Sequence, residues 1–244
     1  MSEEKRLLIV EVKDNVMVIK ANRPEEENGM NWEAYEMMAD AFEEAMARSD
    51  VRVIVMTGDE KHFFTGGRVK YGDPEDKRKY NIALKRRDEV MSRLDVPIIA
   101  AVSGNCRAGG MGFVADADFA IARKGVTFCF SEAKNGTFPM VVIAKTIDVM
   151  NKKKALWAYY SGEAFSAEEA LDMGYLNEVV SNEDFWPTIW KYAGYILHFD
   201  KEVFKIGRKA YYDMRECATR EEKNAVASTA LPELLEAVTR SKNL

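Results

Sequence analysis

The residues in this chain most suited to chemistry lie in two glycine-bearing turns, Thr65–Arg68 and Ala108–Gly112. Glycine lets a ligand approach a backbone N–H closely, and it adopts positive φ without strain. The second turn carries Gly109, Gly110 and Gly112 between a predicted buried strand and a predicted helix. Backbone donors at a helix N-terminus suit an anion, and they stabilise an oxyanion that develops during a reaction. The spacing differs from that of dinucleotide-binding and P-loop motifs.

A third candidate is Glu132, which follows a predicted strand and precedes the turn at Gly136. A lone glutamate in such a position is most often solvated, so spacing alone does not make it catalytic. The two histidines, His62 and His198, are isolated, and no Ser/His/Asp pattern favours a triad hydrolase. The pattern therefore offers one carboxylate together with two sets of backbone donors.

An alternation of strands and helices positions these segments. Apolar runs on either side of Asp14-Asn15 predict a hairpin, and Asn31–Arg48 shows the apolar spacing of a helix. Ser166–Glu169 is a capping box that opens a helix ended by Gly174, and the chain is predicted to be helical from Glu183 onward. The alternation of strands and helices predicts a mostly parallel sheet with right-handed crossovers. The other predicted elements are the strands Leu7–Val12, Val16–Lys20, Val51–Thr57, Pro97–Val102, Phe119–Ala122 and Val126–Phe130, and the helix Pro74–Leu94.

The length fits one large α/β domain, or a domain of about 180–200 residues with an appended element. The 244 residues are 47% hydrophobic, which is enough for a sizeable core, and the net charge of −5 argues against nucleic acid or an anionic membrane as a partner. Cys106, Cys129 and Cys217 are widely spaced, which favours reduced thiols over a zinc site or a disulfide framework. No apolar run is long enough to span a membrane and no signal-peptide pattern opens the chain, so a cytoplasmic protein is expected.

The order and spacing of the three candidate segments resemble the crotonase (enoyl-CoA hydratase/isomerase) superfamily. The resemblance implies an α/β fold with a crotonase-like ββα spiral core at residues 1–190 and a helical C-terminal trimerisation module at residues 191–244. It also implies a homotrimer or a hexamer. Further similar segments, which extend the resemblance over roughly residues 5–190, are Asn22–Glu25, Asn28–Asn31, Pro97–Val102 and Ser166–Val180.

The resemblance implies roles for individual residues in binding an acyl-CoA thioester. Gly67 and Gly109 match the positions whose N–H groups form the family's oxyanion hole, where the thioester oxygen is held while an enolate forms. Coenzyme A enters as part of the substrate, and no separate cofactor or metal is expected. The positions implied in binding it are the loop Asn28, Gly29 and Met30, which matches the segment that cradles the adenine, with Gly66, and Arg23 and Lys70 as partners of the phosphates.

The chain departs from the family pattern at a position that bears on the reaction. Family hydratases use two glutamates to activate one water; Glu132 matches the second, whereas the first falls on Gly112. A single carboxylate suffices to move a proton between C2 and C4 of an enoyl thioester, as in the family's Δ3,Δ2-enoyl-CoA isomerases. We therefore favour an isomerase with Glu132 as its base, in an apolar pocket that raises its pKa.

Four alternatives remain open at this point. Enoyl-CoA hydration is the nearest variant, and relatives that retain only this glutamate, or neither, also decarboxylate or hydrolyse acyl thioesters through the same enolate. A non-catalytic relative that binds CoA or RNA belongs to another class, although the acidic net charge argues against RNA. Arg68 and Arg107 are two further departures. Either both point to solvent, or one of them binds a carboxylate on the acyl group, because a guanidinium matches carboxylate geometry.

Overall fold

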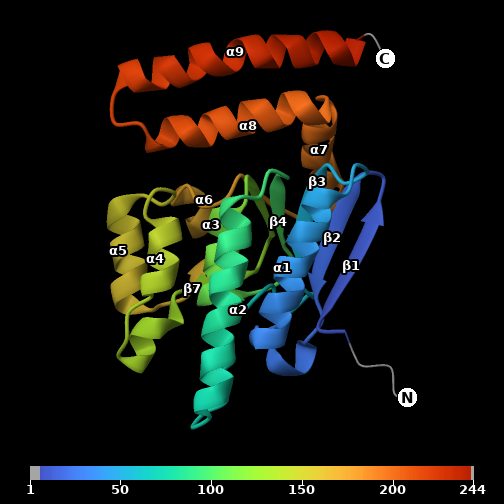
Figure 1. The fold of residues 1–244 in the computed structure, drawn as a ribbon. Coiled ribbons are helices and arrows are strands. Elements are labelled where there is room, and N and C mark those ends of the chain that lie inside the picture. The colour runs from blue at the N-terminus through green and yellow to red at the C-terminus, as the bar shows by residue number, and fades with distance from the viewer. Residues whose placement is uncertain (1–5, 243–244) are drawn as a thin grey trace, which may run out of the picture. The chain divides into compact units, whose positions relative to one another are not determined.

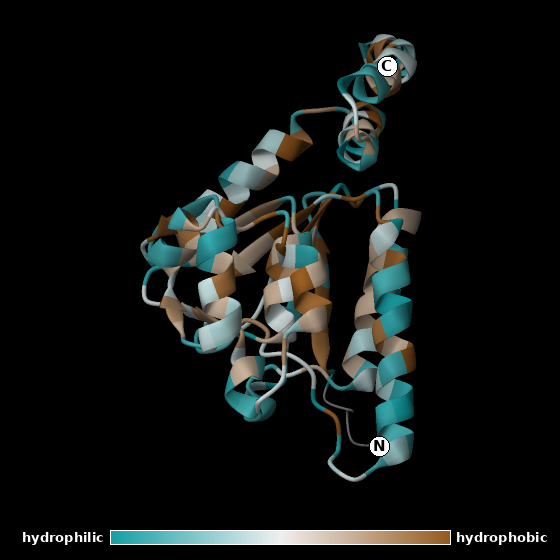
Figure 2. Ribbon diagram, turned by 90° about the vertical axis from the view of Figure 1, so that its left-hand side faces the viewer, coloured by the Kyte–Doolittle hydropathy of each residue, from teal (hydrophilic) through white to brown (hydrophobic). Residues whose placement is uncertain are grey.

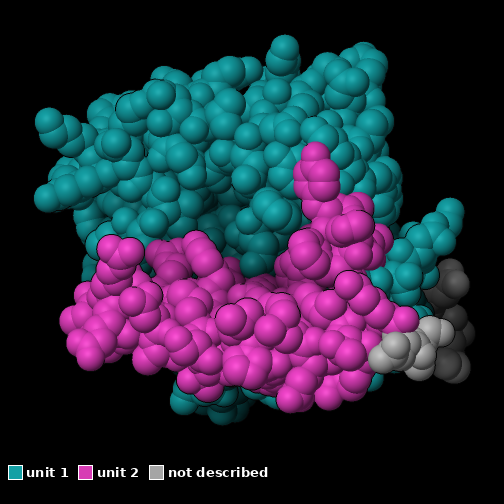
Figure 3. Space-filling view, turned by 90° about the horizontal axis from the view of Figure 1, so that it is seen from above, with its two compact units in different colours: residues 1–192 teal, residues 193–244 magenta. Residues whose placement is uncertain are grey.

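The computed structural model describes residues 6–242, and the chain divides after Tyr192 into two compact units. The larger unit contains all the strands and every candidate site residue. The smaller unit, residues 193–244, is helical where it is described. Figure 3 colours the two units separately.

The larger unit is built on a six-stranded sheet with the strand order β1-β2-β3-β4-β6-β9. β1 pairs with β2 in antiparallel fashion, and every later pairing in this sheet is parallel, which confirms the predicted mostly parallel α/β fold (Figure 1). All residues of β3 and β4 are buried, which explains why both read as continuous apolar runs. The strands are β1 (Leu8–Lys13), β2 (Val16–Ala21), β3 (Val53–Thr57), β4 (Ile98–Val102), β6 (Phe119–Arg123) and β9 (Glu178–Val180).

The β1–β2 hairpin turns at Asp14 and Asn15, whose φ angles are 50° and 66°. Two successive left-handed residues twist in the same sense as the strands, and Asp and Asn tolerate this conformation better than most residues. The predicted hairpin is therefore confirmed, with its turn at the predicted dipeptide.

Two long helices cover part of this sheet and pack against each other: α1 (Trp32–Ala47) and α2 (Pro74–Ser92). The Asn31 side chain accepts a hydrogen bond from Ala34 N at the start of α1. Asp73 caps α2 in the same way, and Pro74 occupies its first turn. Both helices match the predicted segments, except that α2 ends at Ser92 instead of Leu94.

A second, three-stranded sheet contains the strands that precede the second glycine turn and Glu132. Its order is β5 (Cys106–Arg107), β7 (Thr127–Cys129) and β8 (Phe165–Ser166). The predicted strand at 126–130 belongs here and not to the main sheet. Strands of two residues carry too little periodicity for β5 and β8 to be predicted. The shorter elements are η1 (Pro24–Glu26), α3 (Gly109–Asp116), η2 (Ser131–Asn135), α4 (Met140–Thr146), α5 (Lys152–Ser161) and α6 (Ala167–Asp172).

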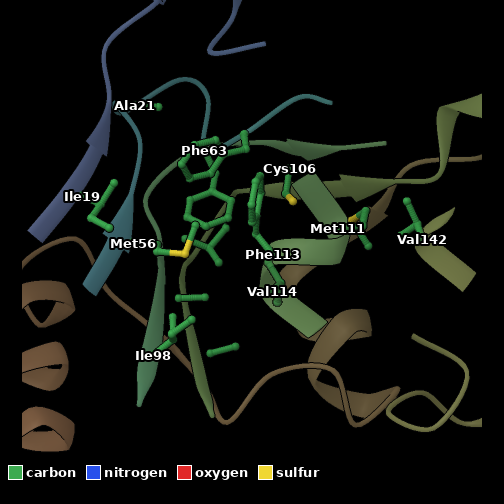
Figure 4. Close-up of a cluster of buried hydrophobic side chains, with 14 of the residues drawn as sticks. Ile19, Ala21, Met56, Phe63, Ile98, Cys106, Met111, Phe113, Val114 and Val142 are labelled. Atoms are coloured by element: carbon green, nitrogen blue, oxygen red, sulfur yellow. The ribbon is translucent and has the colours of Figure 1, made fainter. Parts of the chain in front are cut away.

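The core lies between the main sheet and these helices, and aromatic residues from the loops close its upper part. Phe63, Phe64 and Phe113 are fully or almost fully buried, and the rings of Phe64 and Phe113 lie 4.8 Å apart. Figure 4 shows Phe63 and Phe113 in one cluster with Met56 of β3. Apolar residues also concentrate along the strands in Figure 2. This packing fixes the loops that carry the glycine turns.

Helices make up the rest of the chain, as predicted from Glu183 onward. They are α7 (Phe185–Leu197), which begins in the larger unit, α8 (Lys201–Glu216) and α9 (Arg220–Lys242). α8 and α9 pack against each other within the smaller unit. Within residues 6–242, no helix is both long enough and apolar enough to cross a membrane.

Candidate functional site

The loops that carry the two glycine turns run side by side. Phe63 N–H donates to Asn105 O at 2.9 Å, and Arg107 N–H donates to Phe64 O at 3.1 Å. The two loops are thereby paired in the manner of parallel strands, although only the second contains a short strand. Because the two loops are paired in this register, their glycines lie at the same edge of the structure.

The turns meet at Gly66, Gly67 and Gly109. A methyl group built on Gly66 would lie 3.0 Å from Gly109 N, and one built on Gly109 would lie 3.9 Å from Gly67 N. Gly66 adopts a φ of +90°, which glycine reaches without strain. Gly67 is exposed and Gly109 half-buried, so a ligand can reach both residues.

Both N–H groups at this meeting point lack a hydrogen-bond acceptor. Among the hydrogen bonds of the described residues, none has Gly67 N or Gly109 N as its donor. Gly109 is the first residue of α3, so its N–H has no intrahelical acceptor and lies at the positive end of the helix. Ala108, just before it, adopts φ 45° and ψ −124°, which a non-glycine residue reaches only at a cost of about 1–3 kcal/mol.

Glu132 lies just beyond β7, and the pairing of β7 with β5 brings it towards the second turn. Arg107 pairs with Cys129, and Ala108 N–H donates to Cys129 O at 3.0 Å. Gly109 comes shortly after Arg107 and Glu132 comes shortly after Cys129, so the pairing of these two residues brings Gly109 and Glu132 to the same edge of the second sheet. The half-buried Glu132 has an Oε2 atom that is shielded from solvent and finds no hydrogen-bond partner among the described residues.

The environment of Glu132 favours its neutral form. Burial raises the pKa of this carboxyl, and a hydrogen bond from its own backbone opposes the shift in part. A carboxyl with a raised pKa and a free oxygen is suited both to take up a proton and to return one.

The segment Asn28–Met30 is joined directly to the first glycine turn. Met30 N–H donates to Gly66 O and Arg68 N–H donates to Met30 O, each at 2.8 Å. Asn28 is buried at a φ of 57°, and its amide donates to Asp59 Oδ2 at 2.9 Å. The residues implied in binding the adenine thus lie against the residues implied in binding the thioester.

The two cations implied in phosphate binding differ in whether the charged group already contacts the protein. The Arg23 guanidinium donates to Gly29 O, so it braces the loop that contains Asn28. Lys70 has an exposed side chain, and its backbone N–H donates to Asp76 Oδ2 at 2.7 Å. Lys70 is therefore free to reach an anion, whereas Arg23 would first have to leave a backbone carbonyl.

The expectation that Arg68 and Arg107 point to solvent requires correction. The Arg68 guanidinium donates to Thr65 Oγ1 at 3.0 Å and lies 3.7 Å from Glu27, so it joins the two loops. Arg107 donates to Thr127 O at 2.7 Å and to Thr127 Oγ1, so it ties β5 to β7. Neither side chain points freely into solvent, and a carboxylate on an acyl group would have to compete with these contacts for either guanidinium. The sequence does not reveal the partners Glu27 and Thr127 because they lie in other loops or strands of the chain.

Position 112 is covered by a lysine that sequence reasoning missed. A methyl group built on Gly112 would lie 3.1 Å from Cδ of Lys145 in α4. The Lys145 ammonium lies 2.5 Å from Asp116 Oδ2 and 3.1 Å from Asp88 Oδ1. Arg87 adds a second cation, with Nη1 3.2 Å from Asp88 Oδ1. The space next to Gly112 therefore holds the stem of Lys145, and the nearby carboxylates are paired with cations.

This charge cluster predicts a stability effect. Lys145→Met should lower the free energy of unfolding by about 2–3 kcal/mol, because it leaves two poorly solvated carboxylates with Arg87 alone. The matched control is Lys154→Met, since Lys154 pairs with Asp172 at a more exposed site and should lose less than about 1 kcal/mol. Urea unfolding measures both variants, and equal losses would contradict the role of burial.

Two tyrosines also reach the glycine turns. A methyl group on Gly67 would collide with the Tyr80 hydroxyl, and one on Gly109 would lie 3.6 Å from the Tyr35 hydroxyl. Sequence reasoning placed Tyr35 in the apolar stripe of α1, and Tyr80 lies in a highly charged helix. Helical periodicity identifies a buried face, but it does not indicate where the polar end of a buried tyrosine points.

Comparison with known proteins bears on this geometry. The family model described as "Enoyl-CoA hydratase/isomerase" matches residues 11–242. "Enoyl-CoA hydratase domain-containing protein 3, mitochondrial" of Rattus norvegicus is 27% identical over 217 residues, which cover 86% of this chain and 71% of that protein. "(E)-benzylidenesuccinyl-CoA hydratase" of Thauera aromatica is 28% identical over 175 residues, which cover 70% of this chain and 68% of that protein.

A solved structure of similar fold is that of an enoyl-CoA hydratase from Mycobacterium smegmatis. It superposes with a TM-score of 0.87 at 24% identity, over 98% of this chain and 96% of that chain. At this identity the similarity establishes the fold. The crotonase-like fold predicted from the sequence is therefore confirmed.

Proposed function

Because the chain belongs to the enoyl-CoA hydratase/isomerase family, within the crotonase superfamily, we propose that it holds an acyl-CoA thioester with the N–H groups of Gly67 and Gly109. Processing of an acyl-CoA is what the family match supports. The proposal adds the two donors and assigns to Glu132 the proton transfer that forms the enolate.

The observation that carries the proposal is the pair of unpaired N–H groups. Backbone N–H groups away from water almost always have an acceptor, so the half-buried N–H of Gly109 without one, next to the exposed N–H of Gly67, supports a position for a ligand oxygen between them. The helix end at Gly109 and the rigid loop at Gly67 present these donors before the charge develops. Such preorganised donors stabilise an enolate oxygen more than the neutral thioester oxygen, and this difference lowers the barrier.

The proposed reaction is Δ3,Δ2 isomerisation of an enoyl-CoA. Glu132 takes a proton from C2 of a 3-enoyl thioester, and the electron pair moves into the thioester, whose oxygen the two N–H groups hold. The same carboxyl then returns the proton at C4, which shifts the double bond from C3–C4 to C2–C3. The stem of Lys145 beside Gly112 supports chemistry with one base, because the neighbouring Asp88 and Asp116 are paired with cations.

Hydration is the second candidate, and the similarity to proteins named hydratases favours it. Two assays separate the candidates. With a 3-enoyl-CoA, isomerisation produces the absorbance of the conjugated thioester. With a 2-enoyl-CoA, hydration removes that absorbance. We expect the first activity to exceed the second by at least about 100-fold, because syn addition of water requires an acid and a base on one water. Rapid hydration without isomerisation would overturn the isomerase proposal.

The pH dependence of the reaction follows from the pKa of Glu132. Since a base must be ionised, kcat/KM should rise with pH through this pKa. Burial raises that pKa, so the midpoint should lie above the ordinary value of about 4.3 for a glutamate. A pH–rate profile with a 3-enoyl-CoA measures the midpoint. A midpoint at or below the ordinary value would contradict the role of burial at Glu132.

Binding of the CoA moiety and assembly complete the proposal. We assign the CoA to Asn28, Gly29, Met30 and Gly66, with Lys70 and Arg23 near its phosphates. A homotrimer or a hexamer is supported by exposed apolar side chains, among them Met140, Val141 and Ile147, which are 67%, 54% and 61% exposed. Light scattering coupled to size exclusion measures the assembly, and a monomer would contradict it.

A further inference from the structure

A tyrosine pair stands directly beside the two unpaired N–H groups. The Tyr80 hydroxyl approaches Gly67 so closely that a side chain at position 67 would displace it. Tyr35 lies on the other side, with its hydroxyl near Gly109. The two tyrosine rings meet edge to face, with centroids 5.5 Å apart. Gly67 and Gly109 therefore each have a phenol as the nearest side-chain neighbour.

The position of Tyr80 differs from that of an ordinary core residue. Its side chain comes from α2, whereas the turn it contacts lies in the loop after β3, and Tyr80 is only partly buried. The hydroxyl, and not the ring, comes closest to Gly67. The Tyr80 hydroxyl therefore lies directly against Gly67, the residue whose N–H group would hold the thioester oxygen.

Both phenols keep their protons at neutral pH. Burial raises the pKa of Tyr35, and burial together with the interaction with Tyr35 raises the pKa of Tyr80 far above its ordinary value. Each protonated hydroxyl has one hydrogen to donate. If Tyr35 donates to the Tyr80 oxygen, the Tyr80 hydrogen is left for an acceptor beside Gly67.

A buried cation stands at the far end of this pair. The Arg87 guanidinium is buried, with its carbon 5.4 Å from the centre of the Tyr35 ring and 4.8 Å from that of Phe113. Its charge acts to lower the pKa of Tyr35, against the larger effect of burial. A cation at this position polarises the Tyr35 hydroxyl as a donor, and cooperative hydrogen bonds strengthen one another at low dielectric.

We propose that the Tyr80 hydroxyl donates a third hydrogen bond to the thioester oxygen, with Tyr35 as the residue that positions its proton. The inference rests on the proposed function, because it uses the same enolate and the same two N–H groups. Tyr80 is then a catalytic residue in direct contact with the substrate, and Gly67 must be glycine so that this contact can form. A protonated phenol suits the role because it stabilises developing negative charge without carrying charge itself.

The test compares Tyr80→Phe and Tyr35→Phe with Tyr160→Phe, an exposed tyrosine of α5. The first readout is exchange of the C2 protons of butyryl-CoA in D2O, which requires only enolate formation. The second is the absorption shift of a bound conjugated acyl-CoA, which reports how strongly the carbonyl is polarised. Tyr80→Phe should slow exchange by about 30- to 100-fold with KM changed less than about threefold, and it should reduce the shift. Tyr35→Phe should slow exchange by about three- to tenfold.

The outcomes separate this inference from the proposed function. No exchange in the unaltered protein would overturn both, whereas exchange that is equally fast in Tyr80→Phe would overturn the role of Tyr80 alone. A loss of melting temperature with an unchanged absorption shift would also overturn it, since a merely structural tyrosine behaves in that way. A structure of the unaltered protein with an acyl-CoA analogue adds a measurement independent of any variant. We expect the Tyr80 oxygen within about 3.2 Å of the thioester oxygen, and a separation of more than about 4 Å would contradict the proposal.

Discussion

Glu132→Gln should lower kcat for isomerisation of a 3-enoyl-CoA by about 10³-fold or more while KM changes little. Glutamine preserves the shape of the side chain and its polar end, but it cannot accept the C2 proton, and a positioned base contributes about 10²- to 10⁴-fold. Asp88 and Asp116, the carboxylates beside Lys145, are paired with that lysine and so are not free to replace Glu132. Stopped-flow or steady-state absorbance of the conjugated product measures the change.

The same substitution should stabilise the protein at neutral pH, which separates loss of the base from loss of the fold. Burial makes the folded pKa of Glu132 higher than the unfolded one, so the folded state binds the proton more tightly. Stability contributed by this group is therefore present below the unfolded pKa of about 4.3 and is lost as pH rises through the folded pKa. Glutamine does not ionise, so it avoids this loss. We expect Glu132→Gln to raise the free energy of unfolding by about 1 kcal/mol at pH 8 and to leave it unchanged at pH 4.

Glu163→Gln is the matched control for this variant, because Glu163 is exposed and lies outside the site. It should change neither kcat nor stability by a measurable amount. If Glu132→Gln retained more than about a tenth of the activity, Glu132 would not be the base. If both variants lost activity alike, the loss would not be specific to the site.

Gly109→Ala should lower kcat by about 100-fold without unfolding the protein. The added methyl group would contact the Gly66 backbone at 3.4 Å and the Tyr35 hydroxyl at 3.6 Å, distances that ordinary packing allows. It would also stand 3.9 Å from Gly67 N, within the space that a thioester oxygen needs in order to reach both N–H groups. Loss of one such donor costs about 10²- to 10³-fold in kcat.

Gly112→Ala is the control, since it makes the same change one turn further along α3. Its methyl group would meet only the flexible stem of Lys145, so activity should stay within about threefold of the unaltered protein. Melting curves should be similar for both variants, because alanine also favours the helix over glycine by about 1 kcal/mol. Equal losses of activity in the two variants would show that the helix as a whole, and not the N–H group of Gly109, is sensitive.

The fold could be predicted from the sequence where one physical signal dominates. β3 and β4 are buried on both faces and read as continuous apolar runs, and Asp14-Asn15 has the chemistry of a two-residue turn. The helix N-termini at Asn31 and Ser166 carry side-chain caps, and the latter is a full capping box. These signals come from residues close together in the sequence, so they can be recognised without knowing the tertiary contacts.

The parts of the site that were missed depend on contacts between distant segments. Lys145 lies beside Gly112 because α4 packs on α3, and Tyr80 reaches Gly67 because α2 packs on α1. Arg68 contacts Glu27 of the neighbouring loop as well as Thr65 of its own. The sequence shows the type of each of these residues, but it does not show which distant residue the side chain contacts. That contact depends on the direction of the side chain, which follows from tertiary packing.

The measurement that tests the central claim most directly is exchange of the C2 protons of a saturated acyl-CoA in D2O, followed by NMR. This exchange requires a base and stabilisation of the enolate oxygen, but it is independent of whether isomerisation or hydration follows. We predict exchange catalysed by the unaltered protein, about 100-fold slower exchange in Gly109→Ala and none above background in Glu132→Gln. Turnover of a 3-enoyl-CoA without C2 exchange, or unchanged exchange in both variants, would contradict enolate formation at Gly67, Gly109 and Glu132.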